Sequence, residues 1–235
     1  MNKENYSDIH MHVIPYVDDG ADDFEDALAM LRIAYEDGIR NVIATPHSGA
    51  FDPWRNKVKE NYLLLCERIR DEEIGINLML GAEIRLHLDQ MEKILKRIKK
   101  GKYPTLNGSE KILIEFQPAE NNYYGVAKAI EALINNDYLP IIAHAERYKF
   151  SVDQIYRLCE CGCQIQINFD DVVPMKGDPM SEKTNIMLKD QMEKYIGTDA
   201  HHSYRRTPHI HEALEYLYSE YDESYIDELL SNTIV

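Results

Sequence analysis

Two histidines near the start of the chain have the spacing of a metal-ligand pair. They are His10 and His12, in the stretch Asp8-Ile9-His10-Met11-His12. On a β-strand, residues two apart point to one face, so both imidazoles would face one way while Ile9 and Met11 face apolar packing. Imidazole is the commonest metal ligand among side chains. The pair therefore indicates a metal site, although two incidental histidines on a partly exposed strand would have the same pattern.

Further apolar stretches end in side chains of the same chemical kind. The residues that follow them are His47 after 41–44, Glu83 after 77–80, Glu115 after 111–114, His144 after 140–143, and Asp199 and His201 after 195–198. Solvation of loops does not explain why each stretch finishes in His, Asp or Glu. If the stretches are parallel strands, their carboxyl ends meet at one rim, and we expect these side chains to converge there.

The bulk composition limits what the chain can bind. Its 235 residues include 26 lysines and arginines against 41 acids, which gives a net charge of −15. Such a charge repels polyanions, so we expect no nucleic-acid binding and no attraction to anionic membranes. The sequence has no signal-peptide pattern and no apolar run of membrane-spanning length. We therefore predict a cytoplasmic protein without membrane insertion.

Three of the four cysteines are clustered, in the stretch Cys159-Glu160-Cys161-Gly162-Cys163. A zinc site usually needs C-x2-C spacing and a second ligand pair, so we predict buried thiols at a helix–strand junction instead. No cysteine is followed six residues later by an arginine. The phosphate-binding loop of thiol phosphatases is therefore absent from the sequence, and we expect no cysteine nucleophile.

Strand-like and helix-like stretches alternate along the chain without a linker or a repeat. The predicted strands cover 6–13, 40–45, 77–84, 111–116, 140–144, 164–168 and 195–199, and the predicted helices cover 21–37, 54–74, 89–100, 123–136, 151–161, 181–194, 208–220 and 222–231. This alternation predicts a parallel sheet with crossover helices. A barrel gathers all its strand ends around one mouth, whereas an open sheet spreads them along a line. We therefore predict an α/β fold, a distorted (β/α)7 TIM-like barrel, as one domain over residues 1–235.

The ordered motifs resemble those of a known superfamily. The sequence contains H-x-H, D-D-G, T-P-H, G-A-E, I-E-F, H-A-E-R and T-D-A-H, in that order, between residue 6 and about residue 215. The series resembles the polymerase-and-histidinol-phosphatase (PHP) superfamily, and within it the CpsB/CapC/YwqE-type bacterial protein-tyrosine phosphatases. Each motif is weak alone, but the ordered set is specific. The resemblance implies the PHP fold, with a metal site at the carboxyl ends of the strands.

The resemblance also implies a centre of three metal ions, usually Mn²⁺. By motif position, the first ion would take His47, Glu115 and His144, the second His10, His12, Glu83 and Asp199, and the third Asp19, Glu83 and His201, with Asp18 as the alternative to Asp19. Imidazole and carboxylate ligands without thiolate suit manganese, iron or zinc, and the sequence does not choose between these metals.

Two arginines match the family's phosphate-binding positions. Arg147 ends the H-A-E-R motif, and Arg206 follows T-D-A-H in a loop where Arg205 is adjacent and the register is less certain. Guanidinium groups bind phosphate oxygens two at a time. The resemblance therefore implies that Arg147 and Arg206 bind substrate and act in catalysis together with Asp199 and His201.

The resemblance implies hydrolysis of phosphotyrosine on a bacterial tyrosine kinase, often on its tyrosine-rich tail, in the control of capsule or exopolysaccharide synthesis. A histidinol-phosphate phosphatase, or another small-molecule PHP phosphoesterase, is the main alternative. The negative charge disfavours a PHP exonuclease. A metal-binding scaffold for a kinase would have lost ligands, and none of them is missing here.

Two further questions stay open in the sequence. Homo-oligomer formation through surfaces outside the site is compatible with the resemblance. The loop 48–54 contains Trp54, the only tryptophan, and would either line the substrate mouth or form an apolar cap.

Overall fold

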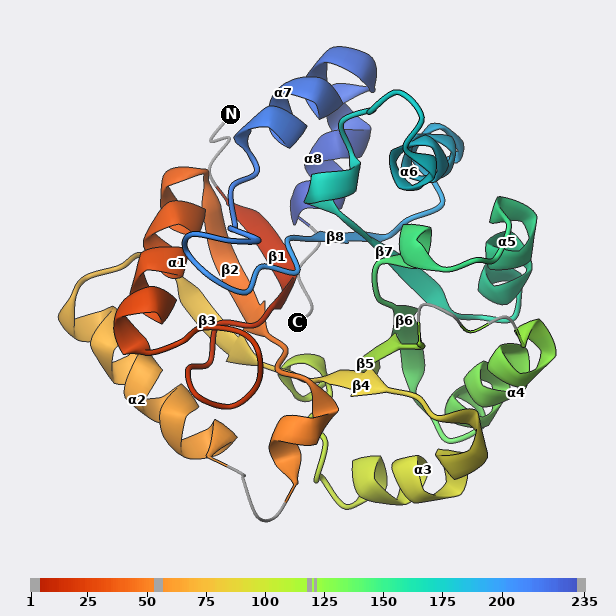
Figure 1. Cartoon of the computed structure of the whole chain (residues 1–235), viewed down its shortest axis with the longest axis horizontal. Coiled ribbons are helices and arrows are strands. Elements are labelled where there is room, and N and C mark those ends of the chain that lie inside the picture. The colour runs from red at the N-terminus through yellow and green to blue at the C-terminus, as the bar shows by residue number, and fades with distance from the viewer. Residues whose placement is uncertain (1–4, 53–56, 118–119, 121, 232–235) are drawn as a thin grey trace.

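Parallel strands alternate with helices in the computed structural model, which describes residues 5–52, 57–117, 120 and 122–231. The strands are β1 (Tyr6–Met11), β2 (Ile39–Ala44), β3 (Asn77–Leu80), β4 (Glu83–Arg85), β5 (Lys111–Glu115), β6 (Leu139–Ile142), β7 (Gln164–Asn168) and β8 (Tyr195–Gly197). The helices are α1 (Phe24–Glu36), α2 (Val58–Asp71), α3 (Met91–Lys99), α4 (Tyr123–Ile134), α5 (Val152–Glu160), α6 (Pro179–Asp190), α7 (His211–Glu220) and α8 (Glu223–Ser231). Figure 1 shows the strands as an inner ring with the helices around the outside. Trp54 lies outside the described residues.

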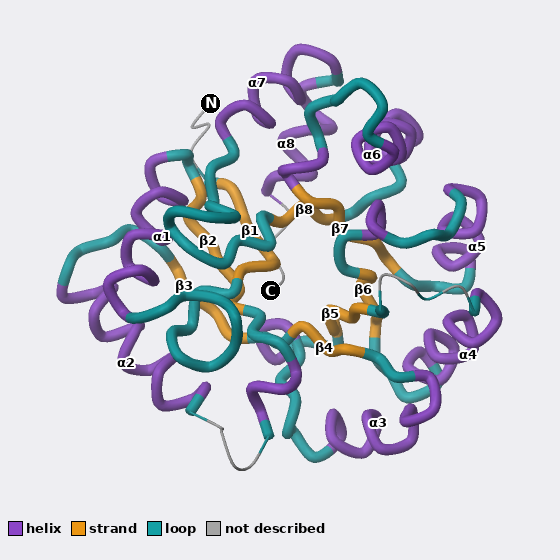
Figure 2. Tube along the Cα trace, viewed as in Figure 1, coloured by secondary structure: helices purple, strands orange, loops and turns teal. Residues whose placement is uncertain are grey.

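The strands form two sheets that together close a barrel. One sheet has the order β1-β2-β3, the other has the order β4-β5-β6-β7-β8, and the described pairs are parallel. Asp199 N donates to His10 O at 2.7 Å, and His12 N donates to Ala200 O at 2.9 Å. These bonds join the end of β1 to the segment after β8, which closes the ring seen in Figure 2. The predicted distorted TIM-like barrel is confirmed.

The third predicted strand, 77–84, is two strands instead of one. β3 pairs with β2, and β4 pairs with β5, so the chain changes neighbours at the break. Gly81 lies at this break, where a Cβ atom would be 2.7 Å from Leu106 Cδ2 and 3.1 Å from Ile43 Cγ2. Glycine is needed because the barrel interior approaches the backbone so closely. Apolar pattern alone does not reveal a change of strand partner, so the prediction of one continuous strand is corrected here.

The first strand departs from simple alternation. Its pairing with β2 is irregular between Asp8 and Met11. Ile9 and Met11 are both buried, but Ile9 packs with residues of β2, β5, β6 and β8 inside the ring, and Met11 packs in the main core. The expectation that they share one face is therefore corrected. A strand irregularity redirects the side chains around it, and here the Nε2 atoms of His10 and His12 lie 3.2 Å apart.

Helix starts follow local capping chemistry. The Asp23 side chain accepts from Asp26 N at 2.9 Å and begins α1. Ser151 and Gln154 form a reciprocal capping box at the start of α5. α6 begins two residues earlier than predicted, because Asp178 caps it and Pro179 occupies its first turn. Side chains that accept from the first free backbone N–H groups fix where a helix begins.

The cysteine cluster lies at the junction of α5 and β7. Cys163 is buried, Cys159 is half-buried, and Cys161 is exposed. The prediction of buried thiols is therefore corrected for Cys161, which is the C-cap residue of α5 and faces solvent.

The helices of the described residues include none that is both long and apolar enough to cross a bilayer.

Glu193, between α6 and β8, gives a test of the fold by pH. Burial, reinforced by Asp190, raises the pKa of Glu193 to about 8 from 4.5, although Lys194 opposes the shift. The folded protein therefore holds this proton more tightly than the unfolded chain does. The free energy of unfolding should then fall as the pH rises from about 5 to about 8.

We expect Glu193→Gln to remove this part of the pH dependence, because glutamine stays neutral. Urea denaturation at pH 5.5 and pH 8 should show the variant gaining stability over the wild type at the higher pH. Glu212→Gln, at an exposed position of α7, is the control and should not change the profile. If the stability of Glu193→Gln depended on pH in the same way as that of the wild type, the raised pKa would not belong to Glu193.

Candidate metal centre

The nine predicted ligand residues lie together at the carboxyl ends of the strands. His10 and His12 come from β1 and its end, Asp19 from the loop before α1, His47 from the end of β2, Glu83 and Glu115 from β4 and β5, His144 from the end of β6, and Asp199 and His201 from the segment after β8. All except Asp19 and His47 are buried. A cavity of about 220 Å³ opens onto the cluster. Burying so many polar groups is costly unless they pair or bind cations.

Four side chains have the separations of a metal coordination shell. His10 Nε2 is 3.5 Å from both Glu83 Oε1 and Asp199 Oδ1. His12 Nε2 is 3.5 Å from both Glu83 Oε2 and Asp199 Oδ1. Ligand atoms about 2.1 Å from one tetrahedral ion lie about 3.4 Å from one another. His10, His12 and Glu83 therefore each offer a ligand atom within 4.8 Å of the others, and Asp199 lies beside the two histidines.

A second group contains buried polar atoms that lack hydrogen bonds. His47 Nδ1 is 2.8 Å from Glu83 Oε2 and 3.4 Å from Glu115 Oε1. Among the described residues, none of these three buried atoms has a hydrogen bond of good geometry, although Glu115 Oε1 is ion-paired with Arg85. Unsatisfied buried polar atoms are rare, so His47 Nδ1 and Glu83 Oε2, which face each other, point to a cation. This donor set of imidazole and carboxylate fits a manganese, iron or zinc ion.

Glu83 is the residue that the groups share. Besides His47, it contacts His144, whose Nε2 is 3.0 Å from Glu83 Oε1. Glu83 has two oxygens, and each lies close to imidazole nitrogens on a different side. A carboxylate in this position can bridge two cations. Its contacts join the histidines expected at the second ion to His47 and His144 of the first, whereas the resemblance implied a bridge between the second and third ions.

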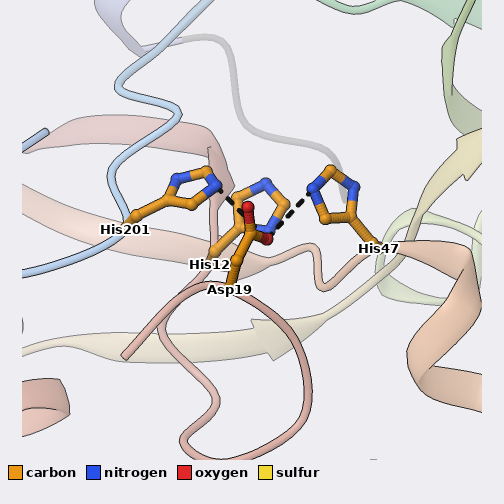
Figure 3. Close-up of side chains that lie close together, drawn as sticks. All are labelled: His12, Asp19, His47 and His201. Carbon is orange, nitrogen blue, oxygen red and sulfur yellow. Dashed lines mark ion pairs between the residues drawn. The ribbon is translucent and has the colours of Figure 1, made fainter. Parts of the chain in front are cut away.

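Asp19 lies between two histidines, as Figure 3 shows. Its Oδ1 is 3.3 Å from His47 Nε2 and 3.7 Å from His201 Nε2. Together with His12 these residues form a third group, whose ligand atoms all lie within 4.8 Å of one another. The neighbouring Asp18 has other contacts, because its Oδ2 accepts from His12 Nδ1 at 3.0 Å and from His47 N at 2.8 Å. The geometry therefore favours Asp19 as the ligand and Asp18 as the residue that orients His12.

Two buried residues that the sequence analysis missed also orient the ligands. Gln166 Oε1 accepts from His144 N at 3.0 Å and faces His10 Nδ1 at 3.1 Å, which leaves His10 Nε2 free for a cation. Asp8 accepts from Thr198 Oγ1 at 2.6 Å and ties β1 to the segment after β8. In the sequence, the available signal was a polar residue alternating with isoleucines in the buried strand β7. Hydrogen bonds to the second nitrogen of a ligating histidine fix its tautomer and direction.

The backbone is constrained at three site residues. His144, Asp199 and Arg206 have φ values of 35°, 51° and 49°, in the left-handed region that residues other than glycine rarely adopt. Such conformations persist where the surrounding contacts enforce them, and they are frequent at functional sites. The turns that follow β6 and β8 therefore aim these side chains into the cavity at some cost in backbone energy.

The two central carboxylates are ionised despite their burial. Burial opposes ionisation, yet His10, His144 and His47 lower the pKa of Glu83 well below its usual value. Asp199 behaves in the same way, because its burial is outweighed by His10 and His12, and its pKa is also well below the usual value. Both acids are therefore anionic near neutral pH and available to cations.

The histidines divide into charged and neutral members. Burial lowers the pKa of His47, but Asp19, Glu115 and Glu83 together raise it to about 12. Burial, His12 and Arg206 lower the pKa of His201 to about 3. The carboxylates thus attract positive charge into the cluster, and a metal cation can supply that charge in place of protons on histidine.

Two arginines converge on one carboxylate at the cavity. Arg147 Nη1 and Arg206 Nη2 each donate to Asp199 Oδ2 at 2.7 Å. The adjacent Arg205 instead donates to His202 Nε2 at 3.2 Å. Arg206 is therefore the arginine of this pair that lines the cavity. Guanidinium groups that converge on carboxylate oxygens can bind phosphate oxygens in the same way.

A third arginine, Arg85, was not among the predicted residues. Its Nε is 2.8 Å from Glu115 Oε1, and its Nη2 donates to Glu115 Oε2 at 3.1 Å. Arg85 lines the same cavity. The signal in the sequence was its position two residues after Glu83, because strand alternation places both on one face.

The fold and the site define the class of protein: a parallel barrel whose strand ends carry imidazole and carboxylate groups arranged for cations. A family model described as "Capsular polysaccharide synthesis, CpsB/CapC" matches residues 6–234. The chain therefore belongs to the CpsB/CapC family, and the resemblance seen in the sequence is confirmed.

Named relatives agree with this assignment. Tyrosine-protein phosphatase YwqE of Bacillus subtilis is 31% identical over 219 residues, which cover 91% of this chain and 84% of that protein. Tyrosine-protein phosphatase CpsB of Streptococcus pneumoniae is 29% identical over 232 residues, which cover 94% of this chain and 93% of that protein.

Solved structures give the same result. A crystal structure from the work on YwqE and CpsB, described as "unique metal-dependent tyrosine phosphatases", matches with a TM-score of 0.81 and 29% identity over 97% of this chain and 96% of that chain. A histidinol phosphate phosphatase from Lactococcus lactis matches with a TM-score of 0.54 and 16% identity, over 92% of this chain and 93% of that chain. The second match shows only that the fold is shared.

Glu83→Gln should reduce the amount of bound metal, because it removes the negative charge shared by the ligand groups. We expect the purified variant, dialysed against Mn²⁺, to bind clearly less metal than the wild type by plasma mass spectrometry. Glu110→Gln is the matched control, because Glu110 is exposed just before β5. Equal metal content in Glu83→Gln and wild type would contradict the ligand assignment.

Proposed function

We propose that this chain is a metal-dependent protein-tyrosine phosphatase, with residues 1–235 as one phosphatase domain. The observation that carries the proposal is that Arg147 and Arg206 meet on Asp199 Oδ2 while Asp199 Oδ1 faces His10 and His12. Phosphate-binding groups thus lie directly beside the candidate metal ligands. Membership of the CpsB/CapC family supports this activity over other phosphoesterase activities.

The metal centre in this proposal has three Mn²⁺ ions held by the nine ligand residues. When bound, such ions neutralise phosphate charge and lower the pKa of water enough to supply hydroxide near neutral pH. The division of ligands expected from the family is supported most closely at the second ion, where His10, His12 and Glu83 form one group and Asp199 lies beside the two histidines. Iron or zinc would suit the same ligands.

The arginines bind and orient the phosphate. In the proposed reaction, Arg147 and Arg206 exchange their hydrogen bonds to Asp199 for hydrogen bonds to the equatorial phosphate oxygens. They offset the negative charge that these oxygens carry in the transition state. Asp199 is then released from the arginines, and its charge is available to a cation. Arg85 remains on Glu115 and adds positive charge at the edge of the cavity.

Protonation of the leaving group needs little help from the chain. The pKa of His201 is lowered to about 3 by burial, His12 and Arg206, which supports a neutral imidazole and disfavours His201 as the proton donor. The leaving group of a phosphotyrosine is a phenolate, whose conjugate acid has a pKa of about 10. A solvent proton therefore suffices after the ester bond breaks. The role of His201 in the proposal is that of a ligand.

The proposed substrate is a phosphotyrosine on a protein, namely the tail of a bacterial tyrosine kinase that controls capsule or exopolysaccharide synthesis. The family description, which names capsular polysaccharide synthesis, supports this part. A cytoplasmic location also belongs to the proposal, and the four unpaired cysteines support it, because thiols stay reduced there. Self-association is not required, because one chain supplies all the proposed ligands.

The panel of substrates that tests this function is small. With Mn²⁺ added, we expect turnover of p-nitrophenyl phosphate and of a phosphotyrosine peptide, and weak turnover of histidinol phosphate. EDTA should abolish the activity, and added Mn²⁺ should restore it. A preference for histidinol phosphate would favour the small-molecule alternative, whereas no turnover with Mn²⁺, iron or zinc would favour a kinase scaffold.

Arg206→Lys should lower kcat/KM by about 10- to 100-fold, because lysine keeps the charge but loses the two-pronged geometry. Arg205→Lys is the matched control, since it changes the adjacent residue, which bonds His202 outside the cavity. Initial rates with a phosphotyrosine peptide should separate the two variants. Similar losses in both variants would argue against a specific role for Arg206.

A further inference from the structure

A second cavity adjoins the candidate metal centre. It has a volume of about 430 Å³ and lies between η1 (Ser48–Phe51) and the start of α3. Its basic lining residues are Arg85, His87, Lys93 and Arg97, and we call this cavity the basic groove. Arg85 lines both cavities, as do Asp19, His47 and Glu115. A molecule bound at the metal centre could therefore extend into the groove.

The positive charge here contrasts with the rest of the chain. Residues 91–102 contain six of the 26 lysines and arginines, and Glu92 is the only acid among them. The whole chain has a net charge of −15. Of the six, Lys93 and Arg97 are four residues apart on α3, so they share one helix face, and both line the groove. Clefts lined by one sign of charge concentrate ligands of the other sign.

The basic residues differ in how far their charge is already used. Arg97 donates to Asp52 at 2.7 Å and stacks over the Tyr103 ring at 4.7 Å, so it is held in place. Lys93 Nζ has one weak contact, at 3.4 Å to Gln90 Oε1. Within the described residues, Lys93 forms no ion pair with a carboxylate. Its charge is therefore available to an anionic group in the groove.

The acids of the groove leave the Lys93 charge available. Asp52 is paired with Arg97, and Glu115 is paired with Arg85. Asp19 faces the candidate metal centre, where the proposed function assigns it to a cation. Among the described residues, Lys93 is thus the groove cation that has no carboxylate partner.

A third cavity, beside α7, shows that basic lining is not general. It is lined by Asp170, Glu212, His209 and His211 together with apolar residues, and its described lining includes no lysine or arginine. The cavity beside α7 is therefore less suited to anions than the basic groove.

We propose that the basic groove binds a second anionic group of the substrate, carried by a residue that flanks the phosphotyrosine. The anion is a carboxylate or a second phosphate, either of which can accept from Lys93 Nζ. This inference rests on the proposed phosphatase function and names the substrate class as phosphotyrosine in an acidic or multiply phosphorylated segment. Lys93 is a specificity residue here, and it does not contact the reacting atoms.

The test compares three phosphotyrosine peptides of equal length. One has neutral flanks, one has glutamates on both sides, and one has flanking phosphonomethyl-phenylalanine, which carries a phosphate mimic that is not hydrolysed. We expect the wild type with Mn²⁺ at low salt to favour the two anionic peptides about three- to tenfold in kcat/KM, mainly through KM. Added salt should reduce this preference, because exposed charges are screened.

Lys93→Glu should abolish the preference. Lys99→Glu is the matched control, because it makes the same charge change on an exposed residue of α3 that does not line the groove. Both variants should hydrolyse p-nitrophenyl phosphate at the wild-type rate, since that substrate has no flanking residues. This readout also shows that both variants are folded.

The outcomes distinguish a failure of this inference from a failure of the proposed phosphatase function. The peptide that the wild type favours, whether the glutamate peptide, the phosphonate peptide or both, identifies the anion. Binding in the basic groove is supported if Lys93→Glu removes this preference and Lys99→Glu retains it. Equal rates for the three peptides in the wild type overturn the inference and leave the phosphatase function intact. An equal loss of preference in both variants also overturns it, because the effect is then due to net charge alone. Failure to hydrolyse every peptide and p-nitrophenyl phosphate overturns both proposals.

Discussion

The arrangement of this protein depends on keeping Glu83 and Asp199 ionised inside a folded structure. Two buried carboxylates repel each other and lose hydration, so they are stable only with positive charge close by. Histidines from separate strand ends supply part of that charge, and Arg147 and Arg206 supply more at Asp199. The same field that draws protons onto His47 would draw a metal cation into the cluster. Metal affinity and phosphate affinity thus arise from one electrostatic arrangement.

The barrel provides the geometry that this arrangement needs. Parallel strands bring residues that are far apart in sequence to one rim, and the ring closes between β1 and the segment after β8 through backbone hydrogen bonds and the contact of Asp8 with Thr198. The irregular pairing of β1 between Asp8 and Met11 and the break at Gly81 show that the ring is not uniform. These local departures from regular pairing redirect side chains near the candidate site. The left-handed backbone at His144 and Asp199 has the same consequence.

Charge is distributed unevenly over this barrel, and the distribution matters more than the total. A net charge of −15 excludes general affinity for polyanions, but it does not prevent a local basic surface. Arg85 joins the candidate metal centre to the groove beside α3, so phosphate chemistry and recognition of flanking residues would share one continuous surface. A negative protein with a basic path at its active site repels most anions and admits those whose charges match the path.

Sequence alone determined the alternation of strands and helices, the candidate ligand residues at the strand ends and the family, because these depend on local periodicity and ordered motifs. It also identified Asp18 and Asp19 as a pair but did not choose between them. That choice needed the tertiary structure, since it depends on which carboxylate meets His12 Nδ1 and which meets His201 across the ring. Tertiary structure likewise decided the change of strand partner at Gly81, the orientation of His10 and His144 by Gln166, and the place of Arg85 between the metal centre and the basic groove. Each of these is a contact between residues distant in sequence, and local pattern carries no information about such contacts.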